Sequence, residues 1–194
     1  MPLAIPADVV AAILSIFLFL ALCGALALVT LSLRRPPTMS LAIATGLIVL
    51  SLAVVAVSPV NVPTLMGFIL ALLGIALAVL GGNPLTRRVL EIAAHGRVRE
   101  TPDGGIILNA ATGDEPGPAL MRGGTVIGYL ERLASVVAIL AGYPEAIAVI
   151  VAVKGIGRFS ELATPEARER FIIGTFGSLL WACVVGGLVR LAIW

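Results

Sequence analysis

Long apolar runs that carry almost no charge recur along this chain of 194 residues, and they limit what it can fold into. A run of about twenty apolar residues can cross the roughly 30 Å hydrocarbon core of a membrane as a helix. Only 12% of the residues are charged, well below the content that is usual in soluble domains. We therefore expect a single integral membrane domain over residues 1–194, an all-α polytopic bundle of about six transmembrane helices.

The placement of basic residues predicts how these helices are oriented. The expected spans are about 9–33, 40–57, 64–82, 125–141, 145–158 and 171–193, with a cytoplasmic loop of about forty residues at 83–123. With the amino terminus outside, twelve of the thirteen Lys and Arg residues fall on the cytoplasmic side, and only Arg190 is left outside. This positive-inside bias predicts a plasma (inner) membrane protein with both termini extracytoplasmic. Residues 1–7 contain no basic residue, so the first run is expected to be a retained helix and not a cleaved signal peptide.

Two of the predicted helices carry stripes of small residues along one face. The stripe residues are Gly67, Ala71, Gly74 and Ala78 in the third span, and Gly174, Ser178, Ala182 and Gly186 in the last. Small side chains let a neighbouring helix approach closely, which is how membrane helices gain van der Waals contact. We expect both stripes to be packing surfaces.

The segment 83–123 is the only long polar stretch. Asn83 as an N-cap and Pro84 as the first helical residue predict a short amphipathic helix that ends near His95 and lies in the membrane interface. Two short extended pieces are expected on either side of a turn at 102–104. His95 is the only histidine, so we predict no metal site.

The helical hairpin at 125–162 is unusual because charged residues interrupt its apolar helices. Glu131 and Lys154 lie at similar distances from the turn at 142–145, so they are expected to pair at matched depth on antiparallel helices. An unpaired charge in the middle of the bilayer costs on the order of 2.5 to 3.5 kcal/mol. The expected intramembrane charge network contains Glu131, Arg132, Lys154, Arg158 and Glu161.

Three interpretations of this network stay open. It can be a structural ion network that fixes helix packing. It can be part of a solute, ion or proton path in which Glu131 exchanges protons or partners with Lys154. Alternatively, Arg132, Arg158 and the basic residues at 168–170 hold an anionic lipid head group or the acidic tail of a partner.

The carboxyl-terminal part of the chain contains the sequences GYLER, AVKGIGRFSEL and ERFIIGT, the last followed by a serine and by WA. This block resembles the carboxyl-terminal membrane segment of a family of uncharacterised bacterial, actinobacterial-type, multi-pass membrane proteins. The resemblance covers roughly 60 residues. It implies a membrane location and supplies no catalytic residue.

Motifs that would indicate an enzyme are absent from the sequence. There is no GxSxG nucleophile elbow, no P-loop and no HExxH zinc motif, so we expect no cofactor. The polar loop also lacks the basic and aromatic pattern of a nucleic-acid-binding surface. We predict a non-enzymatic membrane subunit or scaffold that packs with lipids, with other membrane proteins or with copies of itself. The alternative is a small transporter or channel that uses the Glu131 and Lys154 pair.

Overall fold

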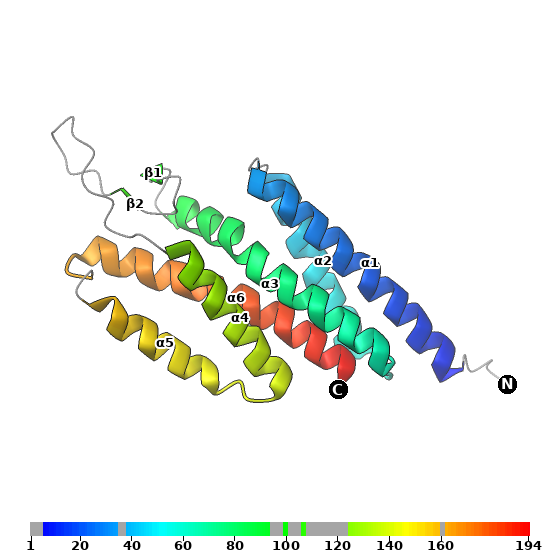
Figure 1. Cartoon of the computed structure of the whole chain (residues 1–194). Coiled ribbons are helices and arrows are strands. Elements are labelled where there is room, and N and C mark those ends of the chain that lie inside the picture. The colour runs from blue at the N-terminus through cyan, green and yellow to red at the C-terminus, as the bar shows by residue number, and fades with distance from the viewer. Residues whose placement is uncertain (1–5, 35–37, 94–98, 101–105, 108–123, 160–161) are drawn as a thin grey trace.

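Six helices make up nearly all of the computed structural model, which describes residues 6–34, 38–93, 99–100, 106–107, 124–159 and 162–194 (Figure 1). The helices are α1 (Ala7–Arg34), α2 (Thr38–Val57), α3 (Thr64–Ala93), α4 (Gly124–Ala141), α5 (Ala146–Gly157) and α6 (Pro165–Ile193). Strands β1 (Arg99–Glu100) and β2 (Ile106–Ile107) form a short antiparallel pair where two extended pieces were expected. The predicted all-α membrane bundle is confirmed.

Five of the six helices are long and apolar enough to cross a membrane, and α5 is the exception. Its 12 residues extend about 18 Å, which is short of the roughly 30 Å hydrocarbon core. The expected span at 145–158 is present as a short helix that runs back along α4 (Figure 1), and its crossing of the membrane stays a prediction. The apolar run at 145–158 has about four helical turns, and the helix in the structure ends at Gly157.

Helix α3 continues through Pro84, so the prediction that a separate helix begins at Asn83 is wrong. The polar segment that was expected to begin at residue 83 is helical up to Ala93. Proline removes one backbone donor, but a membrane helix tolerates it when neighbouring groups satisfy the freed carbonyls. In this bundle a side chain from α4 bonds to the carbonyl of Val79, which is adjacent to the carbonyl that Pro84 leaves without a donor, as described below.

Helix α6 begins six residues before the predicted span at 171–193. Thr164 has an extended backbone, and its side chain accepts a hydrogen bond from the backbone N–H of Ala167 at 3.2 Å. Pro165 occupies the first helical turn. The segment expected to be a polar link therefore starts with a standard N-cap followed by proline, a pattern that is visible in the sequence.

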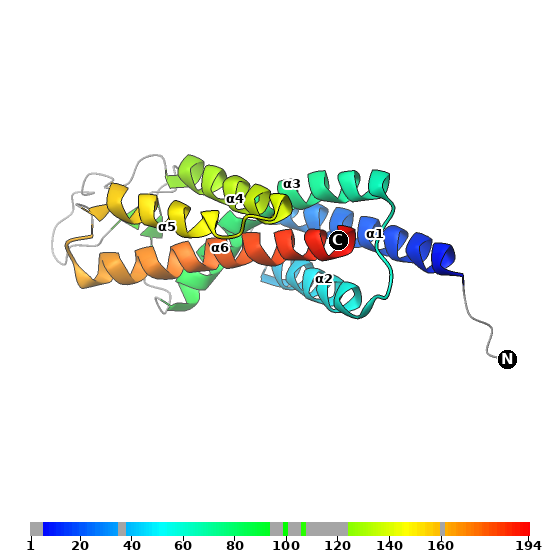
Figure 2. The ribbon, with the colours of Figure 1, turned by 90° about the horizontal axis from the view of Figure 1, so that it is seen from below.

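The α3 and α6 pair forms the centre of the bundle and has the most extensive helix–helix contact. Helices α1 and α2 pack on one side of this pair, and α4 packs on the other side (Figures 1 and 2). Helix α5 runs along the outside of α4 and contains no buried residue. Helix α1 begins, and helix α6 ends, at the same end of the bundle (Figure 1).

The predicted small-residue stripes meet inside the chain. A Cβ atom added to Gly74 of α3 would lie 2.6 Å from Val189 of α6, so these two helices are in direct contact. On α6, Gly186 faces Ile139 of α4. Ala78 and Ala182 are completely buried in the core between the helices. The stripes are therefore used for packing within one molecule.

The contact between Gly81 and Trp181 predicts that one added methyl group at position 81 destabilises the bundle. A Cβ atom at Gly81 would lie 2.7 Å from the indole ring, which is fixed because its Nε1 donates to the carbonyl of Leu77 at 3.2 Å. We expect Gly81→Ala to lower the free energy of unfolding by about 1–3 kcal/mol through overpacking. Unfolding by SDS titration in mild detergent, followed by circular dichroism, measures this.

Gly187→Ala is the matched control for this substitution, because nothing lies within 4 Å of a Cβ atom added there. Alanine is the better helix former, so this variant should be as stable as the unchanged protein or slightly more stable. Equal stability of the two variants would contradict the close packing of α3 on α6.

Candidate functional site

Arg132 of α4 is the most deeply buried charged side chain among the described residues, with 2% of its surface exposed. It extends from α4 between α3 and α6, close to the centre of the bundle. A buried guanidinium is costly unless its N–H groups are hydrogen-bonded. The contacts around Arg132 meet this requirement.

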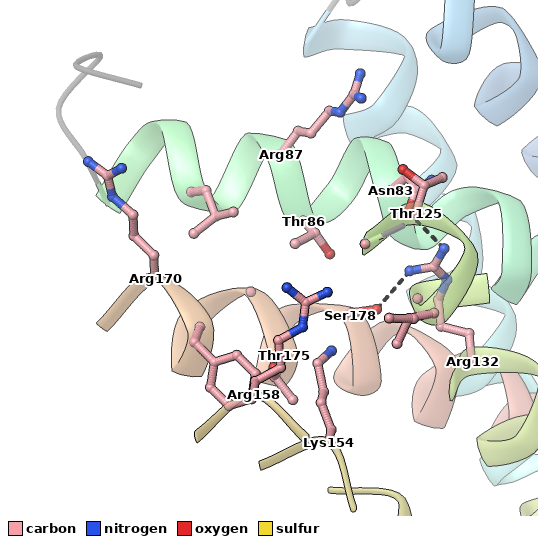
Figure 3. Close-up of a pocket in the computed structure, with 16 residues that line it drawn as sticks. Asn83, Thr86, Arg87, Thr125, Arg132, Lys154, Arg158, Arg170, Thr175 and Ser178 are labelled. Carbon is pink, nitrogen blue, oxygen red and sulfur yellow. Dashed lines mark hydrogen bonds between the residues drawn. The ribbon is translucent and has the colours of Figure 1, made fainter. Parts of the chain in front are cut away.

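Three guanidinium nitrogens of Arg132 each donate one hydrogen bond to a neutral acceptor. Nε donates to the backbone carbonyl of Val79 at 3.0 Å. Nη2 donates to Oδ1 of Asn83, and Nη1 donates to Oγ of Ser178, both at 2.8 Å (Figure 3). The ring of Tyr129 lies 5.3 Å from the guanidinium carbon and adds a cation–π contact. Arg132 therefore connects α4 to both α3 and α6.

Glycine residues provide the space that Arg132 occupies. A Cβ atom added to Gly82 of α3 would lie 2.8 Å from Cζ of Arg132, which is closer than real contacts allow. Gly128 lies one helical turn before Arg132, and a Cβ atom there would be 3.2 Å from Nη1. The Gly-Gly-Asn-Pro sequence of α3 thus supplies the space, a side-chain acceptor and a helix turn that lacks one backbone donor.

Glu131 and Lys154 form an ion pair between α4 and α5. The Nζ atom of Lys154 donates to Oε2 of Glu131 at 2.5 Å, and the two side chains are 17% and 8% exposed, respectively. Lys154 also lies over the ring of Phe171 on α6, at 5.8 Å from the centroid. The expected pairing of these two residues is thus present in the structure. The second oxygen of Glu131, Oε1, is buried and has no hydrogen-bond partner.

A cavity of about 180 Å³ lies among α3, α4, α5 and α6, beside Arg132 and Lys154 (Figure 3). Five of its lining residues are basic, and none of the lining residues in the described part of the chain is acidic. The basic residues come from all four helices and from the C-cap of α5: Arg87, Arg132, Lys154, Arg158 and Arg170. We call this space the basic cavity.

Two polar atoms in the wall of the basic cavity are buried without a hydrogen-bond partner. They are Oγ1 of Thr86 and Nη1 of Arg170. Figure 3 shows Thr86, Lys154 and Arg158 converging at the middle of the cavity, while Arg87 and Arg170 lie farther out. A buried polar atom normally has a partner, so the Thr86 hydroxyl at the middle of the cavity is free to bond to a further group there.

The structure separates the predicted charge network into two parts. Arg132 bonds to neutral acceptors, whereas Glu131 pairs with Lys154. Arg158 lines the basic cavity together with both cations. Glu161 lies outside the described residues. Among the described residues, no group of three or more His, Cys, Asp or Glu side chains could hold a metal ion.

Sequence reasoning missed the residues that α3 contributes to the site. Asn83 was interpreted as a helix cap and Ser178 as a packing residue, but both accept hydrogen bonds from Arg132. Thr86 and Arg87 were assigned to an interfacial helix, yet they line the basic cavity. The clue in the sequence was the position of Asn83, Thr86 and Arg87 on successive turns directly after an apolar span.

Comparisons of the chain with protein-family models, with curated proteins and with solved structures gave no match. The resemblance of the carboxyl-terminal block to a bacterial membrane family therefore stays a prediction. The chemistry of the site rests on the geometry of this chain alone.

The hydrogen bonds of Arg132 predict that a lysine cannot replace it. A lysine ammonium is a point charge and cannot reach the acceptors on α3 and α6 with the planar geometry of a guanidinium. We expect Arg132→Lys to lower the free energy of unfolding by about 2 kcal/mol or more, measured by SDS titration. Arg168→Lys is the control, because Arg168 is exposed. If both variants unfold at the same SDS concentration, the network does not stabilise the bundle.

The Glu131 and Lys154 pair predicts strong coupling between two substitutions. Lys154→Met leaves the buried carboxylate without its cation, so we expect a loss of about 3 kcal/mol in stability. Adding Glu131→Gln should restore most of that loss, because the charge that needed a partner is gone. A double-mutant cycle of unfolding free energies measures the coupling.

The pair of Arg88 and Glu91 provides the comparison for this cycle. Its atoms are 2.8 Å apart, but its side chains are 42% and 53% exposed. Arg88→Met should therefore cost less than about 1 kcal/mol. If the effects of the Glu131 and Lys154 substitutions on the unfolding free energy are additive, the buried pair stabilises the protein no more than the exposed pair does.

Proposed function

We propose that this protein is a non-enzymatic membrane protein that binds an anionic ligand in the basic cavity. One observation carries the proposal: five basic side chains line one small cavity, and no described lining residue is acidic. Basic side chains in such an excess over acidic ones create a positive potential that favours an anion. Phosphate is the chemistry that fits best, since arginine binds its oxygens with paired N–H groups.

The basic residues have different roles in this proposal. Arg132 uses its N–H groups on neutral acceptors within the bundle, so it contributes mainly its positive charge. Lys154 is oriented by Glu131 at the edge of the cavity. Arg170 lies farther out and contributes its positive charge, whereas the Thr86 hydroxyl at the middle of the cavity can donate a hydrogen bond to an oxygen of the ligand. Arg158 lies centrally in the cavity wall (Figure 3).

The proposed orientation places the basic cavity on the cytoplasmic side of the plasma membrane, with both termini outside. The positive-inside bias of the sequence supports this orientation. The arrangement of the helices agrees with it, because α1 begins and α6 ends at the same end of the bundle (Figure 1). The cavity residues Arg158 and Arg170 lie near the opposite end, close to the end of α5 and the start of α6.

The other functions that the sequence suggested have less support. A scaffold that binds partners through its small-residue stripes lacks that surface, since the stripes pack inside the chain. Binding to other membrane proteins or to copies of the same chain stays a prediction. Transport through the Glu131 and Lys154 pair also stays a prediction, and the unpartnered oxygen of Glu131 is the observation in its favour.

Inorganic pyrophosphate is a suitable probe of the basic cavity. We expect the protein in phosphatidylcholine nanodiscs to bind it, with an affinity that decreases as salt is added, in isothermal titration calorimetry. Arg158→Gln removes one positive charge from the centre of the cavity and should weaken binding about tenfold. Arg170→Gln should also weaken pyrophosphate binding. It provides a second variant if Arg158→Gln fails to fold.

Arg168→Gln is the matched control, because Arg168 lies on the same helix as Arg170 but does not line the cavity. It should leave the affinity for pyrophosphate unchanged. The proposal is wrong if the unchanged protein does not bind pyrophosphate. It is also wrong if Arg168→Gln weakens binding as much as the cavity variants do.

A further inference from the structure

The basic cavity lies directly beyond the apolar part of α3. The first nineteen residues of α3, Thr64 to Gly82, extend about 28 Å, which is close to the thickness of the hydrocarbon core. The cavity residues Asn83, Thr86 and Arg87 follow directly after this apolar part of α3. If the apolar part spans the core, the cavity lies at the membrane interface.

In the described part of the chain, α5 forms one side of the basic cavity. This helix packs against α4, and it has hardly any contact with α6 apart from Lys154 over Phe171. None of its residues is buried, and it lies along the outside of the bundle (Figures 1 and 2). The cavity is lined by Lys154 and Arg158 from one side and by Arg170 and Phe171 from the other, so it lies between α5 and α6. A ligand that enters between α5 and α6 would come from the outside of the bundle, where α5 lies.

Apolar side chains also line the cavity next to the basic ones. These are Leu90 of α3, Ile127 of α4 and Phe171 of α6. Ile127 is 40% exposed, so it continues from the cavity wall onto the lipid-facing surface of α4. A free phosphate ion has no apolar part that could contact these residues. A lipid has both a phosphate and a hydrocarbon chain.

We infer that the ligand of the basic cavity is a membrane lipid with a phosphate head group, which enters sideways between α5 and α6. This inference rests on the proposed function and specifies the source of the anion. The phosphate lies among Lys154, Arg158 and the Thr86 hydroxyl, at the point where these side chains converge (Figure 3). The first part of the lipid chain lies against Ile127 and Phe171 and continues into the bilayer. The Glu131 and Lys154 ion pair holds α5 in place as one wall.

The test compares a lipid phosphate with a free one on the same protein. In native mass spectrometry from mild detergent, the unchanged protein should retain one molecule of phosphatidic acid in preference to phosphatidylcholine. Arg158→Gln should weaken retention of phosphatidic acid about tenfold, and Arg168→Gln should leave it unchanged. Equal retention of phosphatidic acid and phosphatidylcholine, or equal effects of the two arginine variants, would overturn the inference.

Ile127→Ser separates the two sources of phosphate. It removes an apolar contact with the lipid chain and should weaken phosphatidic acid binding about three- to tenfold, while pyrophosphate affinity stays the same. Val126→Ser is the control, because Val126 is 60% exposed and does not line the cavity. If pyrophosphate binds but phosphatidic acid has no advantage over phosphatidylcholine, the lipid inference fails and the proposed function stands. If neither ligand binds, both fail.

Discussion

The burial of Arg132 is the constraint on which the rest of the structure depends. A guanidinium among apolar helices is tolerated only if fixed acceptors surround it, and Val79, Asn83 and Ser178 supply them from two other helices. These contacts determine how closely α3, α4 and α6 approach one another. The same contacts explain why a glycine occupies position 82, because a Cβ atom there would overlap the Arg132 side chain.

Close packing of α3 on α6 supplies the rigidity that a buried charge requires. Gly74 and Gly81 allow Val189 and Trp181 to touch the backbone of α3 directly. The opposite end of the bundle is fixed in another way, because Nη1 of Arg190 donates to the carbonyls of Ile139 and Leu140 at the end of α4. Arginines therefore hold α4 at its middle and at its end, by bonding to uncharged oxygens.

The remaining cations of the basic cavity lie toward the end of the bundle where α6 begins. Helix α5 contributes Lys154 and the C-cap residue Arg158 but buries none of its own residues. A tightly packed helix in this place would fill the space between α4 and α6. The short, peripheral helix instead leaves a basic cavity beside the lipid, and this combination of charge and access supports the proposals for its ligand.

The sequence by itself determined the membrane class, the five long helices and the pairing of Glu131 with Lys154, because hydropathy and distance along a helix are local properties. Helix boundaries next to polar residues were predicted less well, as at Pro84 and at Thr164. Only the tertiary structure decided that Arg132 bonds to neutral acceptors, and that Thr86 and Arg170 share one cavity. These residues are far apart in the chain and come together through helix packing, which leaves no periodic pattern in the sequence.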